Sequence, residues 1–350
     1  MKQSKLSDIS VYKTKRATDV KSHYVSTENL LQNCMGIVPY TDKTAIDGIS
    51  FSINDILLGN IRPYLKKAWL AEFGGVCSTD VLVLHPLKIE SSYFKYLICR
   101  DKFFTYVMSS AKGSKMPRGD KAFIMDMTIS LPSINEQKKL ASMLMLIDTL
   151  ISKQEKLVDE LKLYKRGVIS TLNCTALECH EIAVGNVFSI TRGNVLATGN
   201  ISPIKTEKFC YPVYSSQTKN DGLLGYYSDY LYEDAITWTT DGANAGYTKF
   251  RKGKFYCTNV CGVLINNDGY ANNYVAELIN SISKKYVSYV GNPKLMNNVM
   301  AEVKINLPNI ENQEFFSRTI SLIDSKISKE CSILNSLLMT KNALLQKMFI

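Results

Sequence analysis

The chain has 350 residues, with 42 Lys and Arg against 32 Asp and Glu, which gives a formal charge of +10 and a pI of about 9.0. This excess of positive charge favours a polyanionic partner such as nucleic acid or an anionic membrane face. The length suggests two domains, and a hydrophobic fraction of 45% is normal for a folded protein. No run approaches the roughly 20 apolar residues of a membrane helix, and no apolar signal region follows the N-terminus, so we expect a soluble, cytoplasmic protein without membrane contact.

Short apolar runs separated by Gly, Asn and Pro predict an α+β fold in which strands precede a helix. In the first part of the chain they predict strands at residues 9–12, 56–58, 69–72 and 81–84, and a helix over residues 92–108. The second part repeats this order, with strands at residues 235–239, 246–250 and 261–265 and a helix over residues 272–289.

An internal repeat with a constant offset indicates a tandem duplication. Residues 131–137 read Leu-Pro-Ser-Ile-Asn-Glu-Gln, and residues 307–313 read Leu-Pro-Asn-Ile-Glu-Asn-Gln. The same offset pairs Leu-Ile-Asp at 146–148 with Leu-Ile-Asp at 322–324. We therefore expect two similar domains, each followed by a long helix: domain 1 at 1–133, helix 1 at 134–175, domain 2 at 176–308 and helix 2 at 309–350.

The two long helices are predicted to pack as an antiparallel coiled coil, because apolar residues recur with alternating spacings of four and three. The predicted seam of the first helix comprises Met143, Ile147, Leu150, Gln154, Leu157, Leu161, Tyr164 and Val168. The predicted seam of the second comprises Ile320, Ile323, Ile327, Glu330, Leu334, Leu337, Lys341 and Leu344. The helix pair can also serve as a spacer and a docking platform, for which we single out Ile147, Leu157, Leu161, Val168, Ile323, Ile327, Leu337 and Leu344.

Capping residues mark the start of each long helix. Ser133 and Glu136 have the spacing of a capping box after Pro132, and Asn309 is the matching cap candidate after Pro308. Both helices should therefore begin directly after the Leu-Pro pair of the repeat.

Basic and amide side chains cluster on the loops that follow the predicted strands and helices. Arg, Asn and Gln can form paired hydrogen bonds with purine edges, and Lys can hold phosphates. Solvated loops would also be basic, but the recurrence of these clusters in both copies favours contact with double-stranded DNA. The candidate DNA-binding residues are Arg62, Lys66, Lys67, Lys112, Lys115, Arg118, Asn244, Tyr247, Lys249, Arg251, Lys252, Lys294 and Asn297.

The nine cysteines have irregular spacing, so we expect reduced thiols that act as small apolar side chains. The nearest candidates for metal ligands are Cys257 with Cys261 and Cys179 with His180. These do not supply the two short-spaced ligand pairs of a structural zinc site, and only three histidines are present. We expect no metal site.

Catalytic motifs are also missing from the sequence. It contains no phosphate-binding Gly-x4-Gly-Lys-Ser/Thr loop, no Gly-x-Gly-x-x-Gly element and no convincing Ser/His/Asp set. The Gly-Asn-Pro-Lys sequence at 291–294 shares only part of the amino-methyltransferase loop and is interpreted as a turn, while Glu136 is interpreted as a cap and not as part of a nuclease site. We therefore expect a non-catalytic chain whose partner performs the chemistry.

The duplicated Leu-Pro-x-Ile-x-x-Gln sequence that runs into a long helix with Leu-Ile-Asp resembles the specificity subunit of type I restriction-modification systems. Further similarity lies in the segments 55–66 and 236–246 and in the C-terminal Leu-Leu-Gln-Lys-Met-Phe at 344–349. The chain differs in having no obvious helical piece before its first domain, which leaves open how its two ends close up.

This resemblance implies two target-recognition domains that each read half of a split DNA site, separated by helices that fix the spacing. It also implies two DNA methyltransferase (modification) subunits and, in a complete ATP-dependent endonuclease, restriction and translocase subunits. S-adenosylmethionine, ATP and Mg²⁺ would be bound by those partners, and no cofactor by this chain.

Strong divergence between the two domains, beside similar helices, predicts an asymmetric bipartite site. We expect Ala at Arg62 or Arg251 to weaken DNA binding without unfolding the chain, and we expect a steep dependence on salt. Three alternatives remain open: a specificity subunit of a related type II-like methyltransferase or nuclease, a free-standing coiled-coil DNA-binding regulator, and an enzyme whose catalytic motifs are not recognised.

Overall fold

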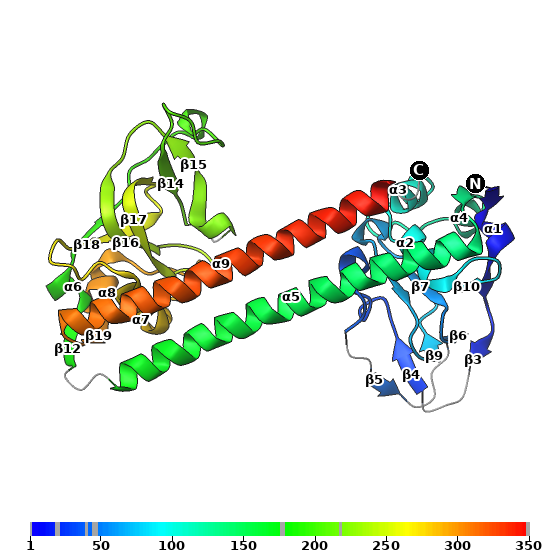
Figure 1. The fold of residues 1–350 in the computed structure, drawn as a ribbon, viewed down its shortest axis with the longest axis horizontal. Helices are drawn as coiled ribbons and strands as arrows, with labels where there is room; N and C mark the ends of the chain where they lie inside the picture. Colours follow the sequence, from blue (N-terminus) through cyan, green and yellow to red (C-terminus); the bar gives the residue numbers. More distant parts are fainter. Residues whose placement is uncertain are drawn as a thin grey trace. The chain divides into compact units, whose positions relative to one another are not determined.

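The computed structural model describes residues 2–17, 22–38, 41–43, 48–175, 179–216 and 219–347 (Figure 1). The chain forms two compact units, of which unit 1 comprises Met1–Glu155 with Ser332–Ile350 and unit 2 comprises Lys156–Cys331. Each unit contains one domain and parts of both long helices. The predicted domain boundary at residue 176 and the last two residues of the C-terminal motif, Met348 and Phe349, lie outside the described residues.

The first domain is α+β, as predicted. Its elements are β1 (Lys2–Lys5), α1 (Leu6–Ile9), β2 (Ser10–Lys13), β3 (Arg16–Ala17), β4 (Ser22–Val25), η1 (Gln32–Cys34), β5 (Thr41–Lys43), β6 (Gly48–Phe51), β7 (Ile56–Gly59), η2 (Pro63–Leu65), β8 (Ala68–Leu70), β9 (Gly75–Cys77), β10 (Val81–Pro86), α2 (Ser91–Ile98), α3 (Asp101–Ser109), α4 (Lys121–Met125) and β11 (Thr128–Leu131). A four-stranded sheet has the order β2-β10-β7-β8, and a five-stranded sheet has the order β3-β6-β9-β4-β5. The predicted helix over residues 92–108 is two helices, because Arg100 adopts an extended backbone conformation between them.

The second domain repeats this plan. Its elements are β12 (His180–Ala183), α6 (Val184–Val187), β13 (Ser189–Arg192), η3 (Thr198–Asn200), β14 (Tyr211–Tyr214), η4 (Lys219–Gly222), β15 (Leu223–Tyr227), β16 (Tyr232–Thr239), β17 (Thr248–Cys257), β18 (Cys261–Ile265), α7 (Asn273–Ser283), η5 (Lys284–Tyr286), α8 (Asn297–Glu302) and β19 (Lys304–Leu307). The main sheet has the order β13-β18-β16-β17-β14-β15. The helix predicted over residues 272–289 is shorter in the structure. It ends at Ser283 and is followed by a short 3-10 turn.

Both main sheets are covered on two faces, because alternate side chains of a strand point to opposite sides. In the first domain Leu58 and Leu82 pack with α2 and α3, whereas Leu57 and Val83 pack with the second sheet. In the second domain Ile236 belongs to the cluster that includes α7. The central strands are apolar almost throughout because neither face meets water.

Strand pairing gives a residue-by-residue correspondence between the central strands of the two domains. Leu58 pairs with Leu82 and Ala68, and Trp238 pairs with Gly262 and Thr248. Each of these positions in the second domain follows its counterpart in the first by the same interval of sequence. The same interval also matches residues of the loops that follow these strands.

The long helix predicted after each domain is present as α5 (Ile134–Thr175) and α9 (Ile310–Lys347), drawn in green and in orange to red in Figure 1. The capping interpretation is confirmed, since Ser133 donates to Glu136 at 2.7 Å and Asn309 Oδ1 accepts from the amide of Asn312 at 2.9 Å. No helix in the described part of the chain is long and apolar enough to cross a membrane.

The buried glutamine that ends each copy of the repeated motif ties a long helix to its domain. Gln137 is 1% exposed and donates to the carbonyl of Pro132, while its Oε1 accepts from the amide of Glu90 at 2.9 Å. Gln313 is fully buried and donates to Pro308 at 2.7 Å. Since Gln313 Oε1 also accepts from Asn272, the motif fastens the start of each long helix to its domain.

Burial follows the predicted seam on α9 and differs from it by one residue at alternate positions of α5. All eight seam residues predicted on α9 are buried or half-buried. On α5, Ile147, Gln154, Leu161 and Val168 are at least half-buried, but Met143, Leu150, Leu157 and Tyr164 are exposed. The buried positions are instead Leu144, Ile151 and Val158, with Lys165 half-buried. The apolar stripe of α5 is two residues wide, so its periodicity does not show which residue of each neighbouring pair faces inward.

Candidate nucleic-acid interface

In the first domain the structure joins two basic loops that are far apart in the sequence. We call residues 60–67 and 112–118 the paired loops of the first domain. The amide of Arg62 donates to the carbonyl of Pro117 at 2.8 Å, and the amides of Lys112 and Arg118 donate to each other's carbonyls at 3.0 and 2.9 Å. The Arg62–Pro117 bond holds one loop against the other, and the two bonds between Lys112 and Arg118 close the second loop on itself, all without a basic side chain.

The second domain builds the same arrangement from different residues. Residues 240–247 and 288–294 are its paired loops. The amide of Gly242 donates to the carbonyl of Pro293 at 2.9 Å, and Ser288 and Lys294 exchange backbone bonds of 2.9 and 3.0 Å. The correspondence continues inside the loop, where the amides of Leu65 and Ala245 donate to the carbonyls of Arg62 and Gly242, both at 2.9 Å.

Two left-handed backbone positions shape the first loop of each pair. They are glycines in the second domain, with φ of 95° at Gly242 and 85° at Gly246. In the first domain the equivalent positions are Arg62 and Lys66, both with φ of 51°. A side chain in this conformation costs roughly 1–2 kcal/mol relative to glycine.

Six of the predicted DNA-binding residues lie on the paired loops of the first domain. Lys112, Lys115 and Arg118 are exposed, and Arg118 forms an ion pair with Asp80 at 2.9 Å. Arg62, Lys66 and Lys67 are half-buried; Lys66 contacts Asp101 at 2.5 Å and Lys67 donates to the carbonyl of Thr27. The structure therefore places these six residues on two adjoining loops.

Fewer of the predicted residues gather on the paired loops of the second domain. Asn244 and Lys294 are exposed, Lys294 lies 3.8 Å from Asp241, and Tyr247 is half-buried. Asn297 lies nearby at the start of α8, where its Oδ1 accepts from Arg192 at 2.9 Å.

Two residues of these regions were missed in the sequence. Arg192 ends β13 and meets Asn297 only in the folded chain. Tyr64, which is 50% exposed, occupies the loop position that corresponds to Asn244. Aligning the two domains in sequence would have matched Tyr64 with Asn244 and so identified Tyr64. No feature of the sequence identifies Arg192.

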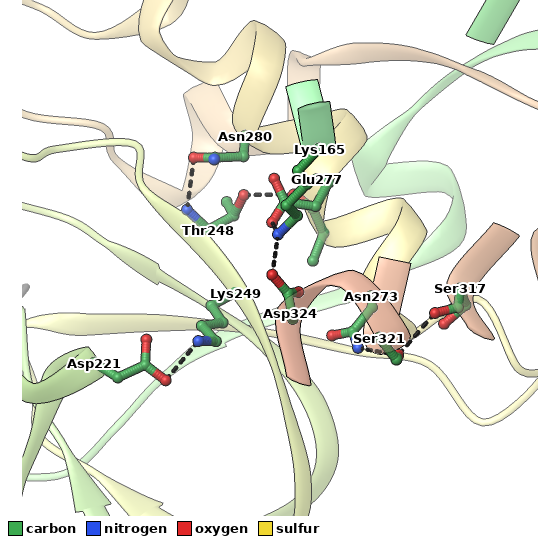
Figure 2. Close-up of polar contacts among 11 residues, drawn as sticks. Lys165, Asp221, Thr248, Lys249, Asn273, Glu277, Asn280, Ser317, Ser321 and Asp324 are labelled. Atoms are coloured by element: carbon green, nitrogen blue, oxygen red, sulfur yellow. Dashed lines mark hydrogen bonds and ion pairs between the residues drawn. The ribbon is translucent and has the colours of Figure 1, made fainter. Parts of the chain in front are cut away.

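The side chain of Arg251, a predicted DNA-binding residue, is buried in the free chain. The residue is 6% exposed, its guanidinium stacks 3.9 Å from the centre of the Tyr214 ring, and its Nε donates to Thr237. Its neighbour Lys249 pairs with Asp221 at 2.5 Å, as Figure 2 shows, and Lys252 is exposed. Strand alternation predicts which face a side chain takes, but only the folded sheet shows that the face of Arg251 is covered.

In unit 1 a carboxylate from α5 joins that helix to α9 and to the first domain. Asp148 forms an ion pair with Lys341 at 2.6 Å and accepts a hydrogen bond from the hydroxyl of Tyr96 at 2.8 Å, with Lys95 at 3.6 Å. Burial opposes ionisation of Asp148, but the hydrogen bond and charge of Lys341 outweigh it and lower its pKa.

In unit 2 an ammonium group from α5 has the corresponding role (Figure 2). Lys165 contacts Glu277 of α7 at 2.5 Å and Asp324 of α9 at 2.7 Å. Burial works against the charged form of Lys165, yet the two carboxylates outweigh it and raise its pKa. In each unit, therefore, α5 and α9 are joined by one ion pair to which each helix contributes one residue.

Comparison with known proteins gives a family match over most of the chain. The family profile described as the type I restriction modification DNA specificity domain matches residues 2–163 and 178–338. A putative type I specificity subunit N-terminus of Mycoplasma pneumoniae is 37% identical over 134 residues, which is 37% of this chain and 70% of the relative. The MpnII type I restriction enzyme specificity subunit of the same organism is 36% identical over 134 residues, 37% of this chain and 39% of that protein.

Solved structures share the fold. The S subunit of a type I restriction-modification system from M. genitalium aligns over 100% of this chain and 96% of its own, with a TM-score of 0.70 and 16% identity. A chain from a structure on complex assembly and conformational transition of a type I system aligns over 99% of this chain and 96% of its own, with a TM-score of 0.55 and 14% identity. The duplicated architecture is therefore shared with these proteins at low sequence identity.

Proposed function

The chain belongs to the family of type I restriction-modification DNA specificity subunits, and we propose that each of its two domains binds one half of a bipartite, asymmetric DNA site. The observation that carries this proposal is the duplicated pair of loops. Both domains use the same backbone bonds to hold these loops together, but they present different side chains on them. A shared loop backbone that presents different side chains is suited to binding two half-sites of different sequence.

The long helices are proposed to set the distance between the half-sites as an antiparallel coiled coil. The second helix ends in unit 1, where Lys341 contacts Asp148, and begins in unit 2, where Asp324 contacts Lys165. Polar pairs at defined seam positions fix the register of a coiled coil. These ion pairs would hold the helices in one alignment and so keep the spacer length constant.

Exposed apolar residues at repeated positions of the long helices support docking of two modification subunits. Leu146 is 62% exposed, and its counterpart in the repeat, Leu322, is 73% exposed. Leu163 and Met339 are the second such pair. Unit 1 contains Leu146 and Met339, and unit 2 contains Leu163 and Leu322. Two equivalent surfaces suit two copies of one partner, and large exposed apolar side chains are typical of interfaces.

Catalysis is assigned to the partners. We propose that methyl transfer, with S-adenosylmethionine, occurs in the modification subunits, and that restriction subunits supply ATP- and Mg²⁺-dependent cleavage where they are present. This chain contributes the choice of DNA sequence.

The test is to co-express the chain with the modification subunit of its system, purify the complex and map the methylated bases in host DNA. A gapped motif with two different halves is expected. A contiguous or palindromic motif would contradict the asymmetric site, and a chain that purifies alone and directs no methylation would favour an independent DNA-binding regulator.

Footprinting of the same complex can assign each half-site to a domain. Arg118→Ala should weaken protection of one half, and Lys294→Ala should weaken protection of the other. Lys88→Ala removes an exposed charge away from the paired loops and is the matched control. Loss of protection over the same half in both variants would contradict one domain per half-site.

Docking can be tested by stoichiometry. Leu146→Asp combined with Met339→Asp should leave one modification subunit in each complex instead of two, and Leu163→Asp combined with Leu322→Asp should do the same. Retention of two modification subunits in both variants would exclude these surfaces.

A further inference from the structure

We propose that Arg62 is the specificity-determining residue of the first half-site and that its guanidinium reads a guanine there. This inference rests on the proposed function and deepens it. It comes from three observations on the paired loops: the left-handed backbone at Arg62, the unsatisfied polar atoms beside it and the charge difference between the two domains.

Arginine is a less favourable residue than glycine for the left-handed backbone conformation at position 62. The second domain forms the same turn with Gly242, the same bond to a proline carbonyl and the same internal bond of 2.9 Å. Glycine adopts φ near +60° to +90° without steric cost, whereas arginine does not. The loop therefore does not need an arginine for its shape, and the strain at this position is explained by use of the side chain.

Two polar atoms in this loop are buried without a hydrogen-bond partner among the described residues. They are Nε of Arg62 and Oδ1 of Asn60, which is 8% exposed. Buried donors and acceptors in folded proteins are nearly always satisfied, so each exception asks for an explanation. Burial keeps Nε itself from a ligand, so a contact with DNA would use the two terminal nitrogens of the guanidinium.

Charge favours DNA as that ligand in the first domain. The paired loops of the first domain carry Lys112, Lys115 and Arg118 at the positions where the second domain has Ser288, Gly291 and Lys294. Exposed lysines and arginines bind phosphates and position a protein on the duplex. Arg62 lies on the loop that they face, and an arginine can donate two hydrogen bonds to O6 and N7 of guanine in the major groove.

The experiment uses the full complex with modification subunits, with DNA affinity, methylation motif and thermal unfolding measured for each variant. Arg62→Gly should weaken affinity for the wild-type site by about 10- to 100-fold, because one base contact is lost. The motif should become degenerate at one guanine of one half only. The unfolding temperature should stay equal or rise, since the strain is released.

Three further variants sharpen the test. Arg62→Lys keeps the charge but loses the paired donors, so it should also lose discrimination at the guanine. Asn54→Gly relaxes another left-handed position, with φ of 70°, and should leave the motif unchanged. Gly242→Arg introduces the side chain where a Cβ meets no atom within 4 Å; it strains the left-handed backbone, with φ of 95°, but should alter only the other half of the motif.

The outcomes separate this inference from the proposed function. If the wild-type complex yields no two-part motif, the proposed function fails. If the wild type yields one and Arg62→Gly retains both motif and affinity, Arg62 is not the reading residue. A fall in the unfolding temperature of Arg62→Gly would overturn the claim that an arginine at this position strains the backbone.

Discussion

Asp148 and Lys341 form an ion pair of 2.6 Å that joins α5 to α9 within unit 1. The offset of the internal repeat converts this pair into Asp324 and Lys165, which are 2.7 Å apart in unit 2. A third charged residue, from the domain, approaches each ion pair. It is Lys95 beside Asp148 in unit 1 and Glu277 beside Lys165 in unit 2, so its charge differs between the units. The duplicated helices thus keep one polar pair, while each domain adds a partner of suitable sign.

Stability should depend on pH through Asp148. Although burial opposes its ionisation, the hydrogen bond and charge of Lys341 keep its pKa below the ordinary value. A carboxylate with a lowered folded-state pKa stabilises the fold above its unfolded pKa, and this contribution is lost as pH falls through the folded pKa.

Denaturant unfolding between about pH 5 and pH 3 should therefore show a steeper loss of unfolding free energy for the wild type than for Asp148→Asn. Asp159→Asn changes an exposed carboxylate of the same helix and serves as the control. Parallel pH profiles for the wild type and Asp148→Asn would refute a stabilising role for the ionised carboxylate.

Gln137→Ala should destabilise the first unit by about 2 kcal/mol, because the buried amide of Glu90 and the carbonyl of Pro132 lose their partner together. Gln313→Ala should act similarly through Pro308. Lys138→Ala, at the exposed neighbouring position, should change little. Equilibrium unfolding in urea measures all three, and equal stability of Gln137→Ala and Lys138→Ala would show that the glutamine does not hold the helix.

Arg251→Ala should lower the stability of the second domain, contrary to the effect on DNA binding alone that the sequence predicts. The substitution removes the stacking on Tyr214 and the bond to Thr237, and together these are worth about 2 kcal/mol. Lys249→Ala affects the same Asp221 from a more exposed position and should cost less. Thermal unfolding distinguishes them, and an unchanged melting temperature for Arg251→Ala would show that its packing contributes nothing.

Asp55→Ala should destabilise the first domain by about 3–5 kcal/mol. Asp55 is fully buried and pairs with Lys13 at 2.6 Å and His85 at 2.7 Å, so its removal leaves Lys13 without its counter-charge. The strand register places Ala235 at the equivalent position of the second domain.

The second domain also suggests a rescue of that variant. Thr191 and Ile265 occupy the positions of Lys13 and His85 in its sheet. The triple variant Asp55→Ala, Lys13→Thr, His85→Ile should therefore recover most of the stability that Asp55→Ala loses. Chemical denaturation measures the recovery, and a triple variant no more stable than Asp55→Ala would show that the cluster is not an exchangeable unit.

The sequence by itself determined the duplication, the fold class, the starts of both long helices and the family. These features depend on local patterns, since the cap at Ser133, the repeated Leu-Pro pair and the helical period lie within short stretches of chain. The offset of the repeat also contained the buried stripe of α5, because it maps Ile320, Ile327 and Lys341 onto Leu144, Ile151 and Lys165.

Only the tertiary structure decided which basic residues share a surface. The bond between Arg62 and Pro117 joins two segments that are distant in the sequence, and the burial of Arg251 depends on Tyr214 from another strand. Side-chain exposure and loop pairing depend on contacts between distant segments, which periodicity and composition do not encode. For this reason the sequence named Arg62 and Arg251 as equivalent candidates, while in the folded chain Arg62 is half-buried on a loop and Arg251 is buried in a sheet.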